Sequence, residues 1–352
     1  MRGRHTRTRT PTERRGPARR VLLAGALAFA LIAGCSRGAP VESGSPLPLE
    51  PIGEIALPGN GSRFDYASID PGRGLLFLAH LGASEVIEVN LRTRQVVRTI
   101  PNITEVHGVL VIPELRRVYA TATGDNRLVV LDEDSGAVLA TGPTGRYPDG
   151  IAYDPTRGAV WTTNESGGTE TVLDAASAAV RGTVDLGGEV GNVAYDPVAD
   201  QMLVAVQGRD DLAAIDPQTL TVTRRLPLPG CENDHGLALD PAARVAFIGC
   251  DGNATLITVD LTTWQPTGTA AVGDQPDVLA DDPGASRLYV AAESGTVTVF
   301  DHQDRNLTVA GSGHLADDAH VVAVDPGTHH SYFPVPTGAD GHPALLEQAP
   351  HS

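Results

Sequence analysis

A strand–turn–strand pattern recurs about every 42 residues along this chain. Its fixed point is an Asp-Pro pair, in which proline presets φ and aspartate caps the turn. In this register the pair occurs six times, and Ile112-Pro113 fills the one gap in the series. The seven anchor residues are Asp70, Ile112, Asp154, Asp196, Asp240, Asp282 and Asp325, at spacings of 42, 42, 42, 44, 42 and 43 residues. This regularity predicts seven copies of one structural unit.

A second position keeps the same register. Seven residues after each anchor stand Phe77, Tyr119, Trp161, Leu203, Phe247, Tyr289 and Tyr332. Six of these seven are aromatic, although aromatic residues make up only 4% of the chain. The runs between the turns are short and β-rich, as at 128–131 and 297–300, and no segment keeps a helical period. Four short strands in each 42-residue repeat predict an all-β, seven-bladed β-propeller.

The ends of the repeat region predict how the ring closes. After Asp325 only 27 residues remain, which is enough for three strands and not for four. A spare strand lies upstream of the first anchor, at 52–57. We expect this N-terminal strand to complete the outer edge of the last blade, because an open sheet edge would otherwise be exposed. The predicted propeller domain covers residues 51–348.

The N-terminus has the pattern of an export signal. Residues 1–20 contain eight Arg and one acid, Glu13, and the apolar run at 21–33 is too short to span a bilayer. The run ends in Leu-Ile-Ala-Gly-Cys at 31–35, which resembles a bacterial lipobox. We therefore predict a lipoprotein signal peptide at 1–34, lipidation of Cys35, a flexible tether at 35–50 and an extracytoplasmic, lipid-anchored protein. An ordinary cleaved signal with an incidental Cys is the alternative, and the membrane that would carry the anchor is left open.

The composition excludes several classes of function. All 26 basic residues are Arg, so chemistry that needs a Schiff-base or phosphate-binding lysine is excluded. The net charge of −17 argues against nucleic-acid partners, which require clustered cations. Cys231 and Cys250 are expected to pair in an oxidising compartment. Their disulfide would close a 20-residue loop, worth about 3 kcal/mol, and two free buried thiols are the alternative.

One further register position predicts the functional site. Function in propellers usually lies at the channel mouth, where the chain enters each innermost strand. Five residues before the anchors stand Asp65, His107, Asp149, Gly191, His235, Asp277 and His320. This ring of carboxylates and imidazoles predicts a ligand site or a divalent metal site (Zn, Cu, Fe or Ca) with His107, His235 and His320 as ligands. A solvated ring of mutually hydrogen-bonded polar side chains is the alternative.

Several segments resemble a known family. The strand Trp161-Thr162-Thr163-Asn164 is similar to the Tyr-Val-Thr-Asn signature of the YVTN (YncE-like) β-propeller repeat proteins. Further similar segments are 64–66, 106–109, 147–150 and the Cys231…Cys250 spacing. The resemblance runs over 51–335 and implies an exported propeller. The family implies no single activity, and the Ile-Pro anchor of repeat 2 and Leu203 of repeat 4 depart from its pattern.

Two function hypotheses follow. The first is a monomeric binding or scaffold module of the cell envelope, held to the membrane by its lipid and recruiting a small-molecule ligand or an envelope protein through its mouth. The alternative is a metal-dependent lyase or lactone hydrolase, in which Asp149 or Asp277 acts as general base. Metal handling or electron transfer at the same ring is a third possibility. Convergence of three His Nε2 atoms on one point would favour the enzyme.

Overall fold

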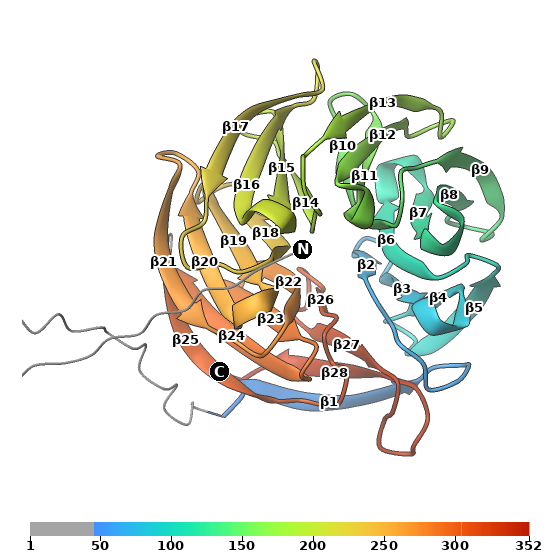
Figure 1. Ribbon diagram of the computed structural model, residues 1–352. Coiled ribbons are helices and arrows are strands. Elements are labelled where there is room, and N and C mark those ends of the chain that lie inside the picture. Colours follow the sequence, from blue (N-terminus) through green and yellow to red (C-terminus); the bar gives the residue numbers. More distant parts are fainter. Residues whose placement is uncertain (1–45, 304, 352) are drawn as a thin grey trace, which may run out of the picture. The chain divides into compact units, whose positions relative to one another are not determined.

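The chain forms a seven-bladed β-propeller, as predicted. A computed structural model describes residues 46–303 and 305–351, so the predicted signal peptide, Cys35 and most of the predicted tether lie outside the described residues. Within the described ranges there are 28 strands and six short 3-10 turns, with no α-helix. The strands form seven antiparallel four-stranded sheets, which are arranged around a central channel (Figure 1).

The first three blades follow the repeats directly. Blade 1 consists of β2 (Ala67–Asp70), β3 (Leu75–His80), β4 (Glu85–Asn90) and β5 (Gln95–Pro101). Blade 2 consists of β6 (Val106–Ile112), β7 (Arg117–Ala122), β8 (Arg127–Asp132) and β9 (Val138–Pro143). Blade 3 consists of β10 (Pro148–Asp154), β11 (Ala159–Asn164), β12 (Thr169–Asp174) and β13 (Val180–Asp185).

The remaining blades repeat this order, except the last. Blade 4 consists of β14 (Val193–Asp196), β15 (Gln201–Val206), β16 (Asp211–Asp216) and β17 (Thr221–Pro227). Blade 5 consists of β18 (Asp234–Asp240), β19 (Val245–Cys250), β20 (Thr255–Asp260) and β21 (Gln265–Ala271). Blade 6 consists of β22 (Pro276–Asp282), β23 (Arg287–Ala292), β24 (Thr296–Gln303) and β25 (Asn306–His314). Blade 7 contains β26 (Ala323–Val324), β27 (Ser331–Val335), β28 (Ala344–Pro350) and β1 (Leu49–Ala56).

The closure of the ring is the one predicted. The last sheet has the order β1-β28-β27-β26, so the N-terminal strand forms the outer edge of blade 7. It pairs antiparallel with β28 from Leu49↔Pro350 to Ala56↔Ala344. Ile55 and Leu57 are buried in the apolar cluster that joins blade 7 to blade 1. Because the two ends of the chain share one sheet, the ring closes without a covalent link.

The repeat positions explain the local structure. Six of the seven anchors are the last residue of an innermost strand, and Asp325 directly follows β26. Anchor carboxylates cap the turns: Asp70 and Asp154 accept hydrogen bonds from the backbone N–H groups three residues on. The residues seven after the anchors lie on the second strands and are buried between blades, Trp161 completely so. Leu203 is buried in the same way, so an aliphatic side chain fills the position in blade 4.

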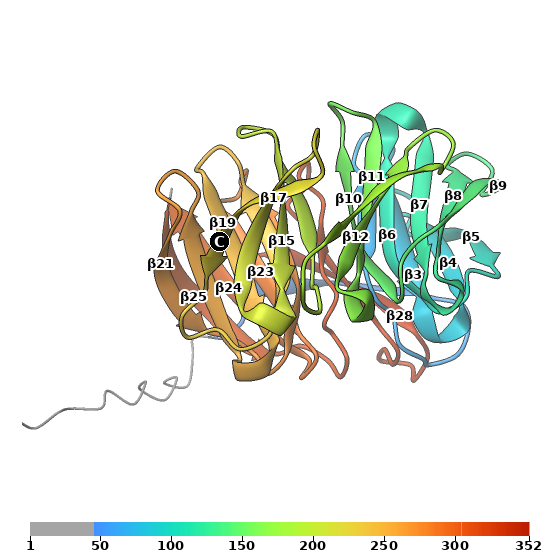
Figure 2. The same ribbon diagram turned by 45° about the horizontal axis from the view of Figure 1, so that its top comes forward.

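The loops gather at two opposite ends of the ring, as Figure 2 shows with the strands seen side on. We call the end at which the innermost strands begin the mouth and the opposite end the far end. Five of the 3-10 turns follow second strands at the mouth, namely η1 (Leu81–Ala83), η3 (Thr123–Asp125), η4 (Glu165–Gly167), η5 (Gln207–Arg209) and η6 (Asp251–Asn253). The sixth, η2 (Pro113–Leu115), is the anchor turn of blade 2.

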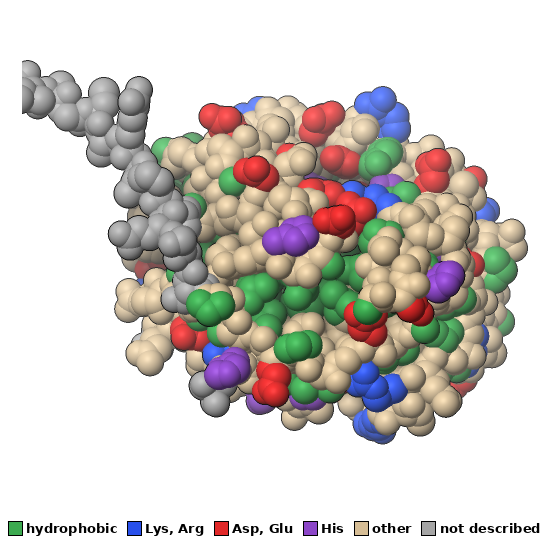
Figure 3. Space-filling model, turned by 90° about the horizontal axis from the view of Figure 1, so that it is seen from below, with side chains coloured by type: hydrophobic (Ala, Val, Ile, Leu, Met, Phe, Trp, Pro, Cys, Tyr) green, Lys and Arg blue, Asp and Glu red, His purple; other side chains and the backbone are tan. Residues whose placement is uncertain are grey.

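Three further observations concern the disulfide, the surface and membrane-spanning segments. Cys231 and Cys250 form the predicted disulfide, which ties the segment before β18 to the end of β19. On the face drawn in Figure 3, acidic side chains are more frequent than basic ones, and apolar side chains form a continuous area in its middle. A search of the described part of the chain finds no helix with the length and apolar character needed to cross a membrane.

Candidate ligand site at the mouth of the channel

The mouth contains a polar cavity of about 200 Å³. Twelve residues line it: Arg63, Asp65, Tyr66, His107, Tyr147, Asp149, Glu165, Gln207, His235, Asp251, Asp277 and Glu293. Five of the predicted ring residues are among them. His320 lies next to this lining, with its Nε2 3.9 Å from Oδ2 of Asp277. Gly191 has no side chain to contribute. No larger residue fits at this position, because a Cβ there would lie 2.6 Å from Cα of His235.

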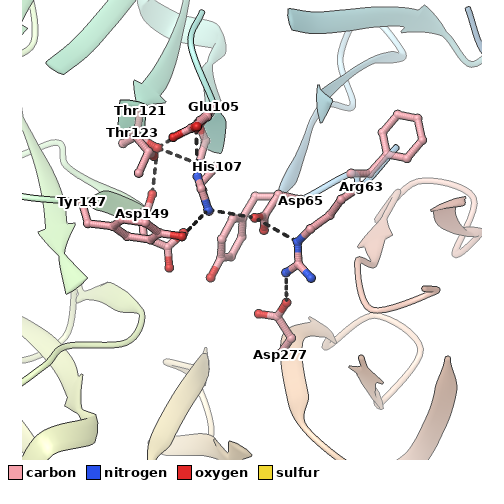
Figure 4. Close-up of polar contacts among 12 residues, drawn as sticks. Arg63, Asp65, Glu105, His107, Thr121, Thr123, Tyr147, Asp149 and Asp277 are labelled. Carbon is pink, nitrogen blue, oxygen red and sulfur yellow. Dashed lines mark hydrogen bonds and ion pairs between the residues drawn. The ribbon is translucent and has the colours of Figure 1, made fainter. Parts of the chain in front are cut away.

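Arg63 provides one cation of the mouth. Its guanidinium lies 2.6 Å from Glu293, 3.6 Å from Asp277 and 3.9 Å from Asp65. Figure 4 shows it between Asp65 and Asp277. Burial works against the charged form, but the three carboxylates outweigh it and raise the pKa of Arg63. Arg63 therefore stays protonated and neutralises part of the acidic ring.

His235 and Asp277 form a buried pair. The two side chains are 3.2 Å apart, from Nε2 to Oδ1, and Nε2 is also 3.4 Å from the Tyr66 hydroxyl. Burial disfavours the imidazolium, but the hydrogen bond to Asp277 and its charge overcome this and raise the pKa of His235 to about 10. The pKa of Asp277 is lowered, because His235 outweighs the cost of burying that carboxylate. The pair is thus ionised at neutral pH.

The other two ring carboxyls have the opposite shift. Burial and the charge of Asp277 raise the pKa of Asp149 to about 6, although His235 works in the other direction. Oδ1 of Asp149 is buried and has no hydrogen-bond partner. Burial, with Asp149 and Asp277 nearby, also raises the pKa of Asp65 well above its usual value. Neighbouring carboxyls with different protonation states are a common property of functional sites.

His107 is fully engaged by its neighbours. Its Nδ1 donates to the carbonyl of Glu105 at 2.9 Å, so its Nε2 accepts from the Tyr147 hydroxyl at 3.1 Å (Figure 4). Burial lowers the pKa of His107, which keeps the ring neutral. Tyr147 has a positive φ of 62°, and this backbone conformation directs its ring to His107, with the centroids 5.1 Å apart. Both nitrogens of His107 are therefore occupied.

His320 differs from His107 in having one nitrogen free. Its side chain is completely buried, and its Nε2 lies 3.0 Å from the carbonyl oxygen of Phe64. A carbonyl can only accept, so Nε2 carries the proton and the Nδ1 lone pair is available. Nδ1 has no hydrogen-bond partner and lies 3.7 Å from Oε2 of Glu293. A ligand histidine held through its other nitrogen by a backbone carbonyl has this arrangement.

Two clusters at the mouth bring three possible metal ligands within 4.8 Å of one another. One is Asp65, Asp277 and His320, and the other is Glu293, Asp318 and His320. Each contains one histidine. His107, His235 and His320, the ligand set that the sequence suggests, do not occur together in any such cluster of the described residues.

The lining residues Glu165 and Gln207 escaped the sequence analysis, although a signal for them exists. Glu165, Gln207, Asp251 and Glu293 all stand eleven residues after an anchor, in the loops between second and third strands. They form a second ring in the same register as the first. Arg63 and Asp318 both stand seven residues before an anchor, in the loops that precede β2 and β26. The residue type at this position varies between blades, so the register alone does not mark them as site residues.

Comparison with known proteins gives no further assignment: no protein-family model matches this chain, and no curated protein matches it. The chemistry of the mouth must therefore be judged from its residues. Six carboxyl groups line the cavity, against one guanidinium and two imidazoles. This composition suits a cation, or a polar ligand with a cationic group, much better than an anion.

Proposed function

We propose that this chain is a lipid-anchored binding module of the bacterial cell envelope, related to the YVTN (YncE-like) propellers, and that it holds a divalent metal ion at its mouth. The export pattern of residues 1–35 and the repeat signature support the first part. The observation that carries the second part is the buried, unpartnered Nδ1 of His320, which faces Glu293. The module acts as a monomer and presents the metal-loaded mouth to a small-molecule ligand or an envelope protein.

Charge balance selects one of the two clusters. His235 already pairs with Asp277, and Arg63 lies between Asp277 and Asp65. The proton on Nε2 of His320 prevents that nitrogen from binding metal on their side. On the other side, Nδ1 of His320 and Oε2 of Glu293 are both available, because Arg63 binds Oε1 of Glu293. Asp318 is exposed and leaves that side open to solvent. Nδ1 of His320, Glu293 and Asp318 are thus the ligands.

The donor set indicates the kind of metal. One imidazole and two carboxylates suit zinc or iron, whereas calcium prefers oxygen ligands alone. Three protein ligands leave at least one coordination position for water or for a group of the bound partner. A metal with an open position would therefore be the point at which this rigid ring recognises its ligand.

The test is the zinc content of the full-length protein, purified in detergent without a His tag, loaded with Zn²⁺ and dialysed. We expect His320→Ala to lower the content by one equivalent. His107→Ala is the matched control and keeps the metal, because both nitrogens of His107 are already hydrogen-bonded. Thermal melts establish that each variant is folded. An unchanged zinc content in His320→Ala, or no zinc in the parent protein, contradicts the proposal.

One observation favours the enzymatic alternative, a metal-dependent lyase or lactone hydrolase. A carboxyl whose pKa is raised to about 6, with a free oxygen, is suited to act as general base, and Asp149 has both properties. Asp277 is less suited, because His235 binds it. In a screen of lactone substrates with zinc-loaded protein, Asp149→Asn would lower kcat by at least about a hundredfold. Turnover that is unaffected by this change excludes Asp149 as the base.

A further inference from the structure

A third cluster of metal-ligating side chains lies at the far end, away from the mouth. Asp240 ends β18 in blade 5, Asp281 stands next to the last residue of β22, and His302 lies near the end of β24. Their ligand atoms are all within 4.8 Å of one another. The cluster therefore spans the interface between blades 5 and 6.

The repeats show that the fold does not require these polar side chains. The residue before the anchor is Ile69, Val111, Tyr153, Tyr195, Leu239 and Val324 in the other six blades, where blade 6 has Asp281. The residue after the Asn or Asp that opens the turn following the third strand is Leu91, Ala175, Pro217 and Leu261 in four blades. At the corresponding position, after Asp301, blade 6 has His302. Blade 6 thus has an acid and an imidazole at two positions that are mostly apolar elsewhere.

Blade 2 offers an informative exception at the second position. There the residue is Glu133, which is buried like His302. Arg73 of the neighbouring blade binds Glu133 at 2.7 Å, so its charge is compensated within the protein. Blade 5 has Ala243 where blade 1 has Arg73. Among the described residues, no arginine lies within ion-pair distance of Asp240 or Asp281.

Asp281 and His302 contact each other, but neither makes a well-formed side-chain hydrogen bond through Oδ1, Oδ2 or Nε2. The side chain of Asp281 is only 5% exposed, and neither of its oxygens makes a hydrogen bond. Nε2 of His302 is 2.9 Å from Oδ1 of Asp281, but it too lacks a hydrogen bond of good geometry. Asp240 uses Oδ1 to cap its own turn, through the N–H of Ala243 at 2.9 Å. Buried carboxylates without donors are costly, and a cation would remove that cost.

We propose that Asp240, Asp281 and His302 bind a divalent transition-metal ion such as Zn²⁺, which ties blade 5 to blade 6. Zinc bonds of about 2.0–2.2 Å put neighbouring ligand atoms roughly 3–4 Å apart, which is compatible with the separations in the cluster. Two carboxylates and a neutral imidazole carry a charge of −2, which a divalent ion balances. This site is independent of the mouth, and its role is structural.

The test uses the full-length protein with the mouth site removed by His320→Ala, so that one equivalent of zinc is expected to remain. Adding Asp281→Val and His302→Leu removes two ligands and restores side chains found at the same positions in other blades. We expect this variant to fold, to lose the remaining equivalent, and to lose the rise in melting temperature of several degrees that Zn²⁺ gives its parent.

The matched control is His329→Ala. His329 also pairs with an aspartate at the far end, Asp282 at 2.8 Å, but it belongs to no three-ligand cluster. It should leave the zinc content and the zinc-induced shift unchanged. The site is rejected if the His320→Ala protein binds no zinc and its melting temperature does not respond to Zn²⁺. It is also rejected if the triple variant keeps the metal. Neither result bears on the mouth, because that site has already been removed.

Discussion

The two ends of the central channel are built by the same seven strands but have opposite chemistry. At the mouth, the positions five residues before the anchors carry three Asp, three His and one Gly. Two residues further along, the same strands present Ala67, Val109, Ile151, Val193, Leu237, Leu279 and Val322, all apolar. These seven line a second cavity of about 390 Å³ toward the far end. Tyr66 contributes to both cavities.

This difference distinguishes positions at which packing fixes the residue type in every blade from positions at which the residue type can vary. The residues of the apolar ring are of one type, because this position of the innermost strand has the same surroundings in every blade. The ring at the mouth is varied, because side chains at the strand entrances are not fixed by packing between blades. Variation between equivalent positions is therefore a better guide to chemistry in this chain than the repeat itself. Asp281 and His302 meet the same criterion at the far end.

Removal of the disulfide is expected to have the largest effect, and it tests whether the mouth is stabilised separately from the far end. It anchors the segment that leads into β18, which carries His235, and has no counterpart at the far end. Replacing Cys231 and Cys250 with Ala should lower the free energy of unfolding by about 3 kcal/mol. Hydrogen exchange should accelerate mainly in the mouth segment around 228–236. Equal acceleration at both ends of blade 5 would show that the mouth is not held separately.

Glu170 is a buried acid that lies outside the mouth cavity. It is the second residue of β12, where the other third strands have Val86, Leu128, Leu212, Leu256 and Val297. Neither of its oxygens has a hydrogen-bond partner, and burial raises its pKa well above the usual value. Glu170→Leu should therefore raise the free energy of unfolding at pH 7 by about 2 kcal/mol, measured by denaturant titration.

The pH dependence provides the control for Glu170. A carboxyl whose pKa is raised in the folded state binds a proton more tightly there, so folding becomes less favourable as pH rises above the pKa of the unfolded chain. The isosteric Glu170→Gln should match the parent near pH 4 and exceed it in stability near pH 7. A stability difference that does not change with pH would mean that Glu170 is ionised or has a partner in the folded protein.

His235 gives the smallest effect, and it tests the electrostatics of the mouth. Its pKa is raised to about 10, so its contribution to stability is complete below pH 6.5 and is lost as pH rises through 10. The stability advantage of the parent over His235→Gln should fall by about 1 kcal/mol between pH 7 and pH 8. His314→Gln, an exposed histidine paired with exposed Asp317, is the control and should show no such change. A constant advantage over His235→Gln contradicts the ionised pair with Asp277.

The fold could be predicted because the same pattern of strands and turns occurs seven times in the sequence. The Asp-Pro anchors and the residues seven positions later gave strand positions, blade number and the closing role of β1, since each depends on local turn chemistry and burial. The mouth ring was found in the same way, by counting from the anchors. Such positions share one environment in every blade, so a register is sufficient to place them.

The contacts within the mouth could not be predicted in this way. Their position relative to the anchors predicts that His107, His235 and His320 lie at the same end of the channel. It does not predict which nitrogen of each imidazole lacks a hydrogen bond. That depends on the carbonyls of Glu105 and Phe64 and on the hydroxyl of Tyr147, which no pattern identifies. Arg63 also changes the charge of the ring, and no other blade has a basic residue at the same position, seven residues before the anchor. The sequence therefore located the site but not its ligand set.

The most direct test of the mouth site is the zinc anomalous signal from crystals of the protein soaked in Zn²⁺. We predict a peak about 2.0–2.2 Å from Nδ1 of His320, with carboxylate oxygens of Glu293 and Asp318 as the other protein ligands. Nε2 of His320 should keep its hydrogen bond to Phe64, and Arg63 should stay with Asp65 and Asp277. A soaked crystal with no peak at His320, or with zinc bound between Asp65 and Asp277, would contradict the proposed metal centre.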